Sequence, residues 1–178
     1  MHRSAICSAV LLTIMLGCSG APRAHDATPD AAPDASHTGD TQALLAIIDA
    51  IEKGWEQGDA APFERHFLDF EGARYVESGG QNEGLRDLVD HHVVPEKDAL
   101  AGLLLDFDKV ETHVEGDFAW AVADVEVRAE IRADGRTIHK RGYETFLFRR
   151  VAGVWKVVHT HSSTRSVAPV PSDGHEHG

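Results

Sequence analysis

The sequence predicts an α+β domain, with helices in its first half and long antiparallel strands in its second. Between residues 44 and 55 apolar side chains recur every three or four positions, which is the spacing of one helix face. Along residues 118–132 every second side chain is apolar, which is typical of a strand with one buried face. The 42% hydrophobic and 26% charged residues in 178 indicate one globular domain with extra segments.

The first extra segment resembles an export signal. A basic start precedes an apolar run over residues 5–16, which has the length of a signal-peptide core and is too short to span a bilayer. The run leads into Gly17 and Cys18 in a pattern that resembles the bacterial lipobox. We therefore expect residues 1–17 to be removed, and Cys18 to carry a lipid that anchors the protein to the membrane. The alternative is ordinary secretion with Cys18 as a spectator.

Two further segments flank the expected domain. Residues 18–40 contain no large apolar side chain, so nothing in them offsets the entropy of ordering, and we interpret them as a tether. Residues 167–178 are polar, broken by proline and carry histidine, which indicates a loose tail. The folded domain is thus expected over residues 41–166. Ser19 after the lipidated cysteine favours the periplasmic face of the outer membrane in a bacterial cell envelope.

Two helices are expected before the first strand. Asp40 can cap the first helix and Gly58 can end it. Asp59 can cap a short second helix that has proline in its first turn. Residues 73–78 then form an expected strand, which two glycines close.

A third helix is expected from about Glu83. Its apolar spacing places His92 on the inner face and turns His91 away. Pro95 disfavours helical geometry in the residue before it, so we expect the helix to break there and restart through Glu96.

The register of the following strands depends on their turns. The dipeptide at 134–135 is Asp-Gly, which predicts a two-residue hairpin. This turn would place Val125 opposite Glu144 and Ala123 opposite Phe146. Glu144 and Phe146 would then face the interior.

The last strand follows from a second turn. A four-residue turn over 150–153 would place Glu144 opposite His159, with Trp155, His159 and His161 all facing the interior. A turn of odd length would break this alignment.

Charge and cysteine content exclude some functions. The formal net charge of -12 would repel a nucleic-acid backbone, so we exclude nucleic acid as a partner. Both cysteines, Cys7 and Cys18, lie at the start of the chain, which excludes a disulfide framework and a cysteine-based zinc site in the folded part. The chemistry is left to histidine, carboxylates and hydroxyls.

Three segments carry a family resemblance. They are the Trp-Glu-Gln-Gly-Asp run at 55–59, the Gly-Asp-Phe-Ala-Trp run at 116–120 and the closing segment 153–163 with its Trp-x-x-x-His-x-His-Ser pattern. With the element order, they make residues 41–166 similar to the SnoaL-like bacterial branch of the nuclear transport factor 2-like superfamily. The resemblance implies a cone-shaped half-barrel whose curved sheet wraps a long helix and leaves a pocket at its wide end.

The resemblance also implies a homodimer through the outer face of the sheet, where Phe118, Trp120 and Val122 would suit an interface. The catalytic motifs of the isomerase-like and dehydratase-like members do not align with this chain. Fold-level likeness therefore says little about activity.

The candidate site is a cluster of histidines and carboxylates. His159 and His161 have the spacing at which two imidazoles bind one metal from the same side of a strand, and His92 could close the site from the helix. We therefore predict a Zn or Cu site, or a pocket for a small polar ligand. The expected lining of this pocket is His92, Glu96, Glu144, Phe146, Trp155, His159, His161 and, less centrally, Glu77.

Two alternatives stay open. In the first, the pocket belongs to an isomerase, dehydratase or hydrolase-type enzyme, with His159 as general base and Glu144 as its partner. In the second, backbone carbonyls satisfy the histidines, no ligand binds, and the domain is a protein-interaction module.

Overall fold

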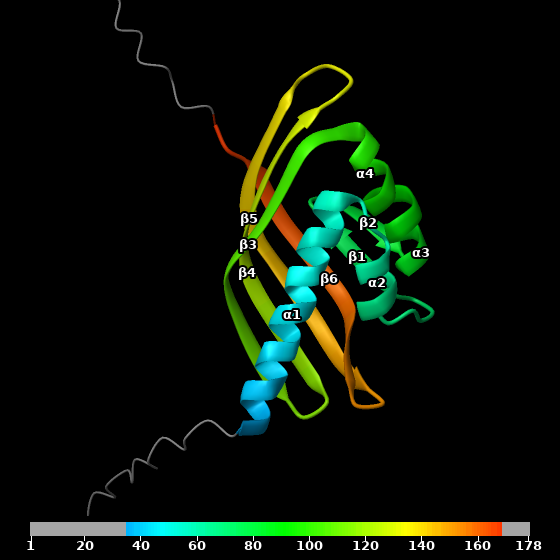
Figure 1. Ribbon diagram of the computed structural model, residues 1–178, viewed down its shortest axis with the longest axis vertical. Coiled ribbons are helices and arrows are strands. Elements are labelled where there is room, and N and C mark those ends of the chain that lie inside the picture. The colour runs from blue at the N-terminus through cyan, green and yellow to red at the C-terminus, as the bar shows by residue number, and fades with distance from the viewer. Residues whose placement is uncertain (1–34, 169–178) are drawn as a thin grey trace, which may run out of the picture. The chain divides into compact units, whose positions relative to one another are not determined.

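The computed structural model describes residues 35–168, and its fold confirms the predicted α+β class. Helices pack against one face of a curved, unclosed sheet of six strands (Figure 1). The helical elements are α1 (Ala35–Gln57), α2 (Ala61–His66), α3 (Leu85–Leu88), the π-helical turn η1 (Val89–Val93) and α4 (Val94–Ala99). The strands are β1 (Arg74–Glu77), β2 (Gly80–Glu83), β3 (Leu100–Glu115), β4 (Phe118–Ile131), β5 (Thr137–Val151) and β6 (Val154–Ser166). Within residues 35–168, no helix is long and apolar enough to cross a membrane.

The long helix α1 lies along the concave face of the sheet (Figure 1). Most of its predicted apolar stripe is buried, namely Leu44, Ile47, Ile48 and Ile51, whereas Leu45 is exposed. The helix begins at Ala35, so the prediction that Asp40 caps it is wrong. Asp40 instead accepts hydrogen bonds from the Arg150 guanidinium (2.6 Å) and from Nε1 of Trp155 (3.0 Å), which ties α1 to the end of the β5–β6 hairpin.

Residues 80–99 differ from the expected helix. A short strand, β2, occupies the position of the expected helix start, and the helix begins at Leu85. The chain then stays helical through Pro95, because the π-helical turn before it changes the hydrogen-bond spacing: the N–H of Val94 donates to the carbonyl of Val89. A regular α-helix would bring the proline ring against the carbonyl four residues earlier. The expected break is thus a local change of helix type.

The sheet has the strand order β2-β1-β6-β5-β4-β3, with β1 parallel to β6 and the other pairs antiparallel. The strand β3 lies at one edge. There, Glu52 and Glu56 of α1 accept hydrogen bonds from the backbone N–H groups of Phe107 (2.9 Å) and Leu105 (3.1 Å). These carboxylates cover N–H groups that an edge strand would otherwise expose.

The β4–β5 hairpin differs from its predicted register by two residues. Ala123 lies opposite Glu144, and Ala121 opposite Phe146, because the connection is longer than the predicted two-residue turn. An even shift keeps each side chain on its face of the sheet. The inward orientation of Glu144 and Phe146 is therefore confirmed, with 7% and 1% of their surfaces exposed.

The β5–β6 pair contradicts the prediction for the last strand. Phe148 lies opposite Val157, but Leu147 lies opposite His159, so Val158 is an extra residue in a β-bulge. One inserted residue reverses which side chains face inward. Thr160 is therefore buried, and the predicted inward orientation of the two histidines of β6 is wrong.

Candidate functional site

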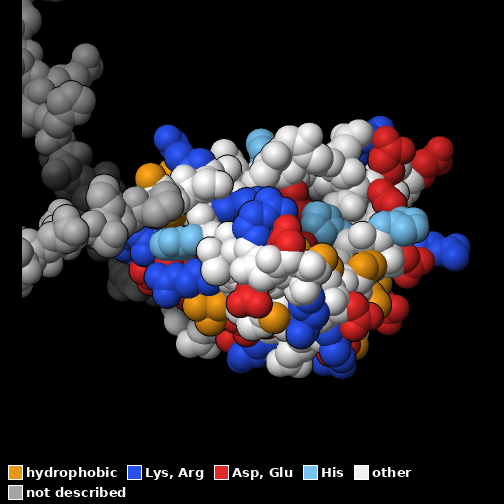
Figure 2. All heavy atoms as spheres, turned by 90° about the horizontal axis from the view of Figure 1, so that it is seen from above, with side chains coloured by type: hydrophobic (Ala, Val, Ile, Leu, Met, Phe, Trp, Pro, Cys, Tyr) orange, Lys and Arg blue, Asp and Glu red, His pale blue; other side chains and the backbone are white. Residues whose placement is uncertain are grey.

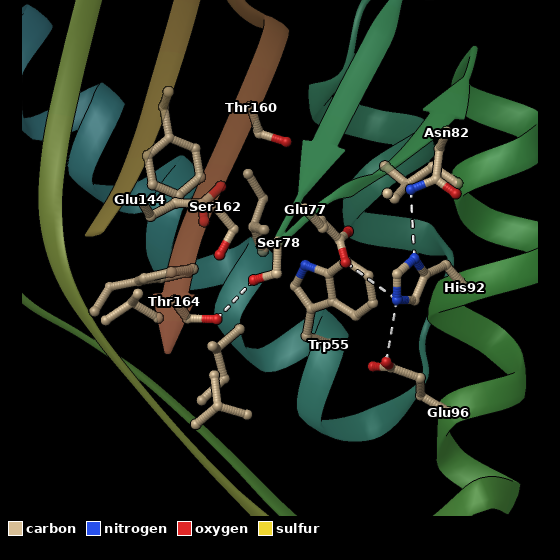
Figure 3. A pocket seen from close by; sticks show the side chains of 18 of the residues that line it. Trp55, Glu77, Ser78, Asn82, His92, Glu96, Glu144, Thr160, Ser162 and Thr164 are labelled. Atoms are coloured by element: carbon tan, nitrogen blue, oxygen red, sulfur yellow. Dashed lines mark hydrogen bonds and ion pairs between the residues drawn. The ribbon is translucent and has the colours of Figure 1, made fainter. Parts of the chain in front are cut away.

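A cavity of about 460 Å³ lies between the sheet and the helices. One side of it is apolar and is formed by β3, β4, Phe146 of β5 and the helices. The other is polar and is formed by β1, β2, β6, the segment that carries His92, and Lys140 and Glu144 of β5 (Figure 3). The apolar lining comprises Ile51, Trp55, Phe63, Phe67, Leu88, Leu103, Leu105, Phe107, Val125, Val127 and Phe146. The polar lining comprises Glu77, Ser78, Gln81, Asn82, His92, Glu96, Lys140, Glu144, Thr160, Ser162 and Thr164.

His92 is the centre of a polar cluster on one wall. Its Nε2 lies 3.1 Å from Oε2 of Glu77 and 3.2 Å from Oε1 of Glu96, and its Nδ1 lies 3.3 Å from Nδ2 of Asn82 (Figure 3). An amide nitrogen can only donate, so Nδ1 accepts from Asn82, and the neutral ring carries its proton on Nε2. Nε2 thus lies within ion-pair distance of the two carboxylates, and the His92 ring is nearly perpendicular to the Trp55 ring, at 5.2 Å between centroids.

The three charged groups of this cluster adjust one another's protonation. The hydrogen bond to Glu96 raises the pKa of His92. Burial opposes this rise, and the charge of Glu77 adds to it. Burial raises the pKa of Glu77, while His92 and Lys140 oppose that rise. Glu77 is therefore a partly buried carboxylate, and His92 fixes one of its oxygens.

Glu144 lies deeper in the same cavity. Burial raises the pKa of Glu144 to about 8. The hydrogen bond with Ser162 lowers this pKa, and the nearby carboxylate of Glu77 raises it further. Glu144 is therefore protonated at neutral pH. Burial thus raises the pKa of both acidic side chains, Glu77 and Glu144, in this cavity.

The structure brings together five of the predicted pocket residues, which are Glu77, His92, Glu96, Glu144 and Phe146. It does not bring the other three there. Trp155 is buried in the core beneath Arg150. On the outer face, Nδ1 of His159 bonds the carbonyl of Arg74 at 2.7 Å, and His161 is exposed.

The predicted metal centre of His92, His159 and His161 is therefore wrong, and so is the pairing of His159 with Glu144 as catalytic partners. The bulge at Val158 separates the last two histidines from the cavity. Residues 35–168 contain no group of three or more His, Cys, Asp or Glu side chains suited to a metal ion.

Sequence reasoning missed several polar groups of the site. Thr160, Ser162 and Thr164 line the cavity from alternate positions of β6, and Thr164 bonds the hydroxyl of Ser78 at 2.7 Å. This alternation of small hydroxyl side chains is visible in the sequence and could have indicated the inner face of the strand. The role of Asn82 had no such signal, because it depends on the unpredicted strand β2.

The surface at the end of the domain where α4 lies mixes acidic, basic and histidine side chains (Figure 2). A mixed surface gives little long-range attraction to a ligand of either charge. The selectivity of the site is thus expected to arise inside the cavity.

The SnoaL-like domain family matches residues 34–168 of the chain. No curated protein matches it significantly. Among solved structures, the chain is similar to a nuclear transport factor 2-like superfamily protein from Salmonella enterica, with 19% identity and a TM-score of 0.66 over 80% of this chain and 99% of that one.

Two further similar structures have names that refer to elimination reactions. One is the hexachlorocyclohexane dehydrochlorinase LinA-type3 from Novosphingobium barchaimii, with 16% identity and a TM-score of 0.64 over 76% of this chain and 93% of that one. The other is a proposed dehydratase from Streptomyces avermitilis, with 16% identity and a TM-score of 0.60 over 74% and 99%. At these identities the likeness shows the fold.

Proposed function

Because the chain belongs to the SnoaL-like domain family, we propose that its cavity binds a small, largely apolar organic molecule and removes a proton from it, as in an elimination or isomerisation. The observation that carries this proposal is the carboxylate of Glu77, which His92 holds at 3.1 Å on the polar wall of a cavity whose opposite wall is apolar. A carboxylate of raised pKa with one oxygen fixed and the other free is suited to act as a general base.

In this mechanism Glu77 takes the proton, and His92 is a positioning residue. Nε2 of His92 orients the carboxylate, Glu96 contacts the same nitrogen, and Asn82 donates to Nδ1 on the other side of the ring. The apolar wall of β3 and β4 excludes water from the substrate, which strengthens the base. The names of the dehydrochlorinase and the proposed dehydratase support this reaction class.

The test uses 5-nitrobenzisoxazole, a small aromatic whose ring opens when a base removes one carbon-bound proton. We expect a saturable rate above that of buffer, which falls about a hundredfold in Glu77→Gln because one positioned base contributes that much or more. The matched control is Glu111→Gln on the exposed outer face, which should keep the wild-type rate. A Glu77→Gln rate equal to the wild-type rate would contradict the assignment.

The positioning role of His92 has its own readout. His92 lowers the pKa of Glu77, so His92→Gln should move the acidic limb of the pH–rate profile to higher pH besides lowering the rate. A purely structural role would lower the rate at every pH without moving that limb.

We also propose that the protein is exported and anchored through a lipid on Cys18, at the periplasmic face of the outer membrane. The support is the lipobox-like sequence, which lies outside the described residues. Metabolic labelling with a tagged fatty acid in a bacterial host should mark the wild type and Cys7→Ala, but not Cys18→Ala. Equal labelling of the two variants would refute this anchor.

We further propose a homodimer through the outer face of the sheet. Phe118, Val122 and Tyr143 are exposed on this face. The strand β3 carries acidic side chains and β6 carries basic ones. A two-fold axis parallel to the strands would place the acidic side chains of one copy opposite the basic side chains of the other. Sedimentation should show a dimer that Val122→Lys dissociates. The matched control Leu45→Lys, at an exposed apolar position of α1, should leave the dimer intact.

A further inference from the structure

Glu144 has no role in the proton transfer just proposed, although it is the most buried charged side chain of the cavity. It forms no ion pair within residues 35–168, and its hydrogen-bond partner there is the hydroxyl of Ser162. The cavity leads directly to its carboxyl group (Figure 3). Burying a carboxyl without a cation is costly, so a ligand that supplies the cation would relieve this cost.

Neither positive group that lines the cavity, His92 or Lys140, forms an ion pair with Glu144 among the described residues. Nε2 of His92 contacts both Glu77 and Glu96, and the charge of Lys140 acts on Glu77. The charged groups facing Glu144 are therefore Glu77 from β1, His92 from η1, Glu96 from α4 and Lys140 from its own strand. Among them, Glu77 repels the ionised form of Glu144.

The surroundings of Glu144 suit an ammonium group. Phe107 and Phe146 line the cavity beside it, with their rings edge to face at 5.3 Å, and aromatic faces attract cations. Thr160 and Ser162 present hydroxyl oxygens from β6. An ammonium group has three donors, which one carboxylate and two hydroxyl oxygens can satisfy.

We propose that the substrate of this cavity is a small aromatic or alicyclic amine, whose ammonium group is bound by Glu144 and the hydroxyls of β6. This inference rests on the proposed function and names the class of its substrate. The amine end lies at Glu144, and the rest of the molecule extends along the apolar wall toward Glu77.

Amine binding then requires Glu144 to ionise. With a pKa of about 8, roughly a tenth of Glu144 is ionised at pH 7 and nine tenths at pH 9. The affinity for an amine should therefore rise about tenfold between these values, since a primary amine keeps its proton up to about pH 10. A neutral alcohol would instead accept a hydrogen bond from the protonated acid, so its affinity should stay constant or fall.

The experiment is isothermal titration calorimetry of the wild-type chain with 3-phenylpropylamine, 3-phenylpropan-1-ol and 3-phenylpropanoate. At pH 8 we expect the amine to bind at least about tenfold more tightly than the alcohol, as for a desolvated charge pair, and the acid not to bind. The difference in binding heat between titrations at pH 7 in phosphate and in Tris should correspond to nearly one proton released per amine bound. Glu144→Gln, which keeps the side-chain shape, should lose the amine preference and its pH dependence, whereas Glu111→Gln should keep both.

Three results would overturn the inference: equal affinity for amine and alcohol at pH 8, an amine affinity that falls from pH 7 to pH 9, or an intact amine preference in Glu144→Gln. The nitrobenzisoxazole used to test the base carries no amine and depends on Glu77. The two proposals therefore fail separately, since loss of the amine preference leaves the proton-transfer result standing.

Discussion

The buried Glu144 makes the stability of the domain depend on pH in an unusual direction. Its pKa of about 8 in the folded protein lies above the ordinary value of 4.5, so the folded state holds the proton more tightly than the unfolded state. The contribution of Glu144 to the free energy of unfolding must then fall as the pH rises from 4.5 to 8. Glu144→Gln removes this proton and should remove the fall.

The size of the effect follows from the pKa difference. Each pKa unit corresponds to about 1.4 kcal/mol, so the full shift of Glu144 amounts to roughly 5 kcal/mol at most. Part of it belongs to the repulsion by the nearby Glu77. We therefore expect Glu144→Gln to match the wild type near pH 5, and to be more stable than it by about 3 kcal/mol or more at pH 9.

The assay is urea unfolding followed by tryptophan fluorescence at pH 5, 7 and 9. Glu111→Gln is the control, because its carboxylate lies on the exposed face. His92 changes the stability with pH in both proteins, so the difference between the wild type and Glu144→Gln reports Glu144 together with its coupling to Glu77. Parallel stability curves for these two proteins would refute the raised pKa and the burial that causes it.

Three further perturbations test other contacts. Glu96→Gln should lower the pKa of His92 toward its ordinary value, because the hydrogen bond to Glu96 is the main cause of its rise; an unchanged NMR titration of the imidazole would refute this. Asp40→Ala should cost about 2 kcal/mol in urea unfolding, because it leaves two donors of a partly buried cluster unpaired, and a loss below about 0.5 kcal/mol would contradict it. Gly142→Ala should cost about 3 kcal/mol or more, because its Cβ would lie 1.9 Å from the carbonyl oxygen of Ser163 on the next strand; wild-type thermal stability would contradict that close approach.

A structural feature can be predicted from the sequence when the pattern that determines it lies within a few neighbouring residues. The inward orientation of His92 depends on helical spacing within a few residues, so the sequence predicts it correctly despite the π-helical turn. The contact between His92 and Glu77 is different, because it depends on β1 pairing in parallel with β6, more than eighty residues later in the chain. The alternation of apolar residues does not specify which strands become neighbours, so Glu77 was only a secondary candidate.

The two hairpins show that an error in strand register changes which side chains face the cavity only when the shift is an odd number of residues. In the β4–β5 hairpin the turn was misjudged by two residues, and Glu144 still faces the cavity. In the β5–β6 pair one extra residue, Val158, reverses the orientation of all that follows. Two adjacent valines fit either face of a strand equally well, so the sequence pattern does not locate the bulge.

The extra residue Val158 decides which polar side chains β6 presents to the cavity. Without the bulge, β6 would present its two imidazoles to the same face of the sheet as Glu144. With it, the strand presents the hydroxyls of Thr160, Ser162 and Thr164, which have no net charge at neutral pH. Hydroxyls do not replace the missing counter-charge of a buried carboxyl, so burial keeps the pKa of Glu144 raised to about 8, and a bound cation would lower it.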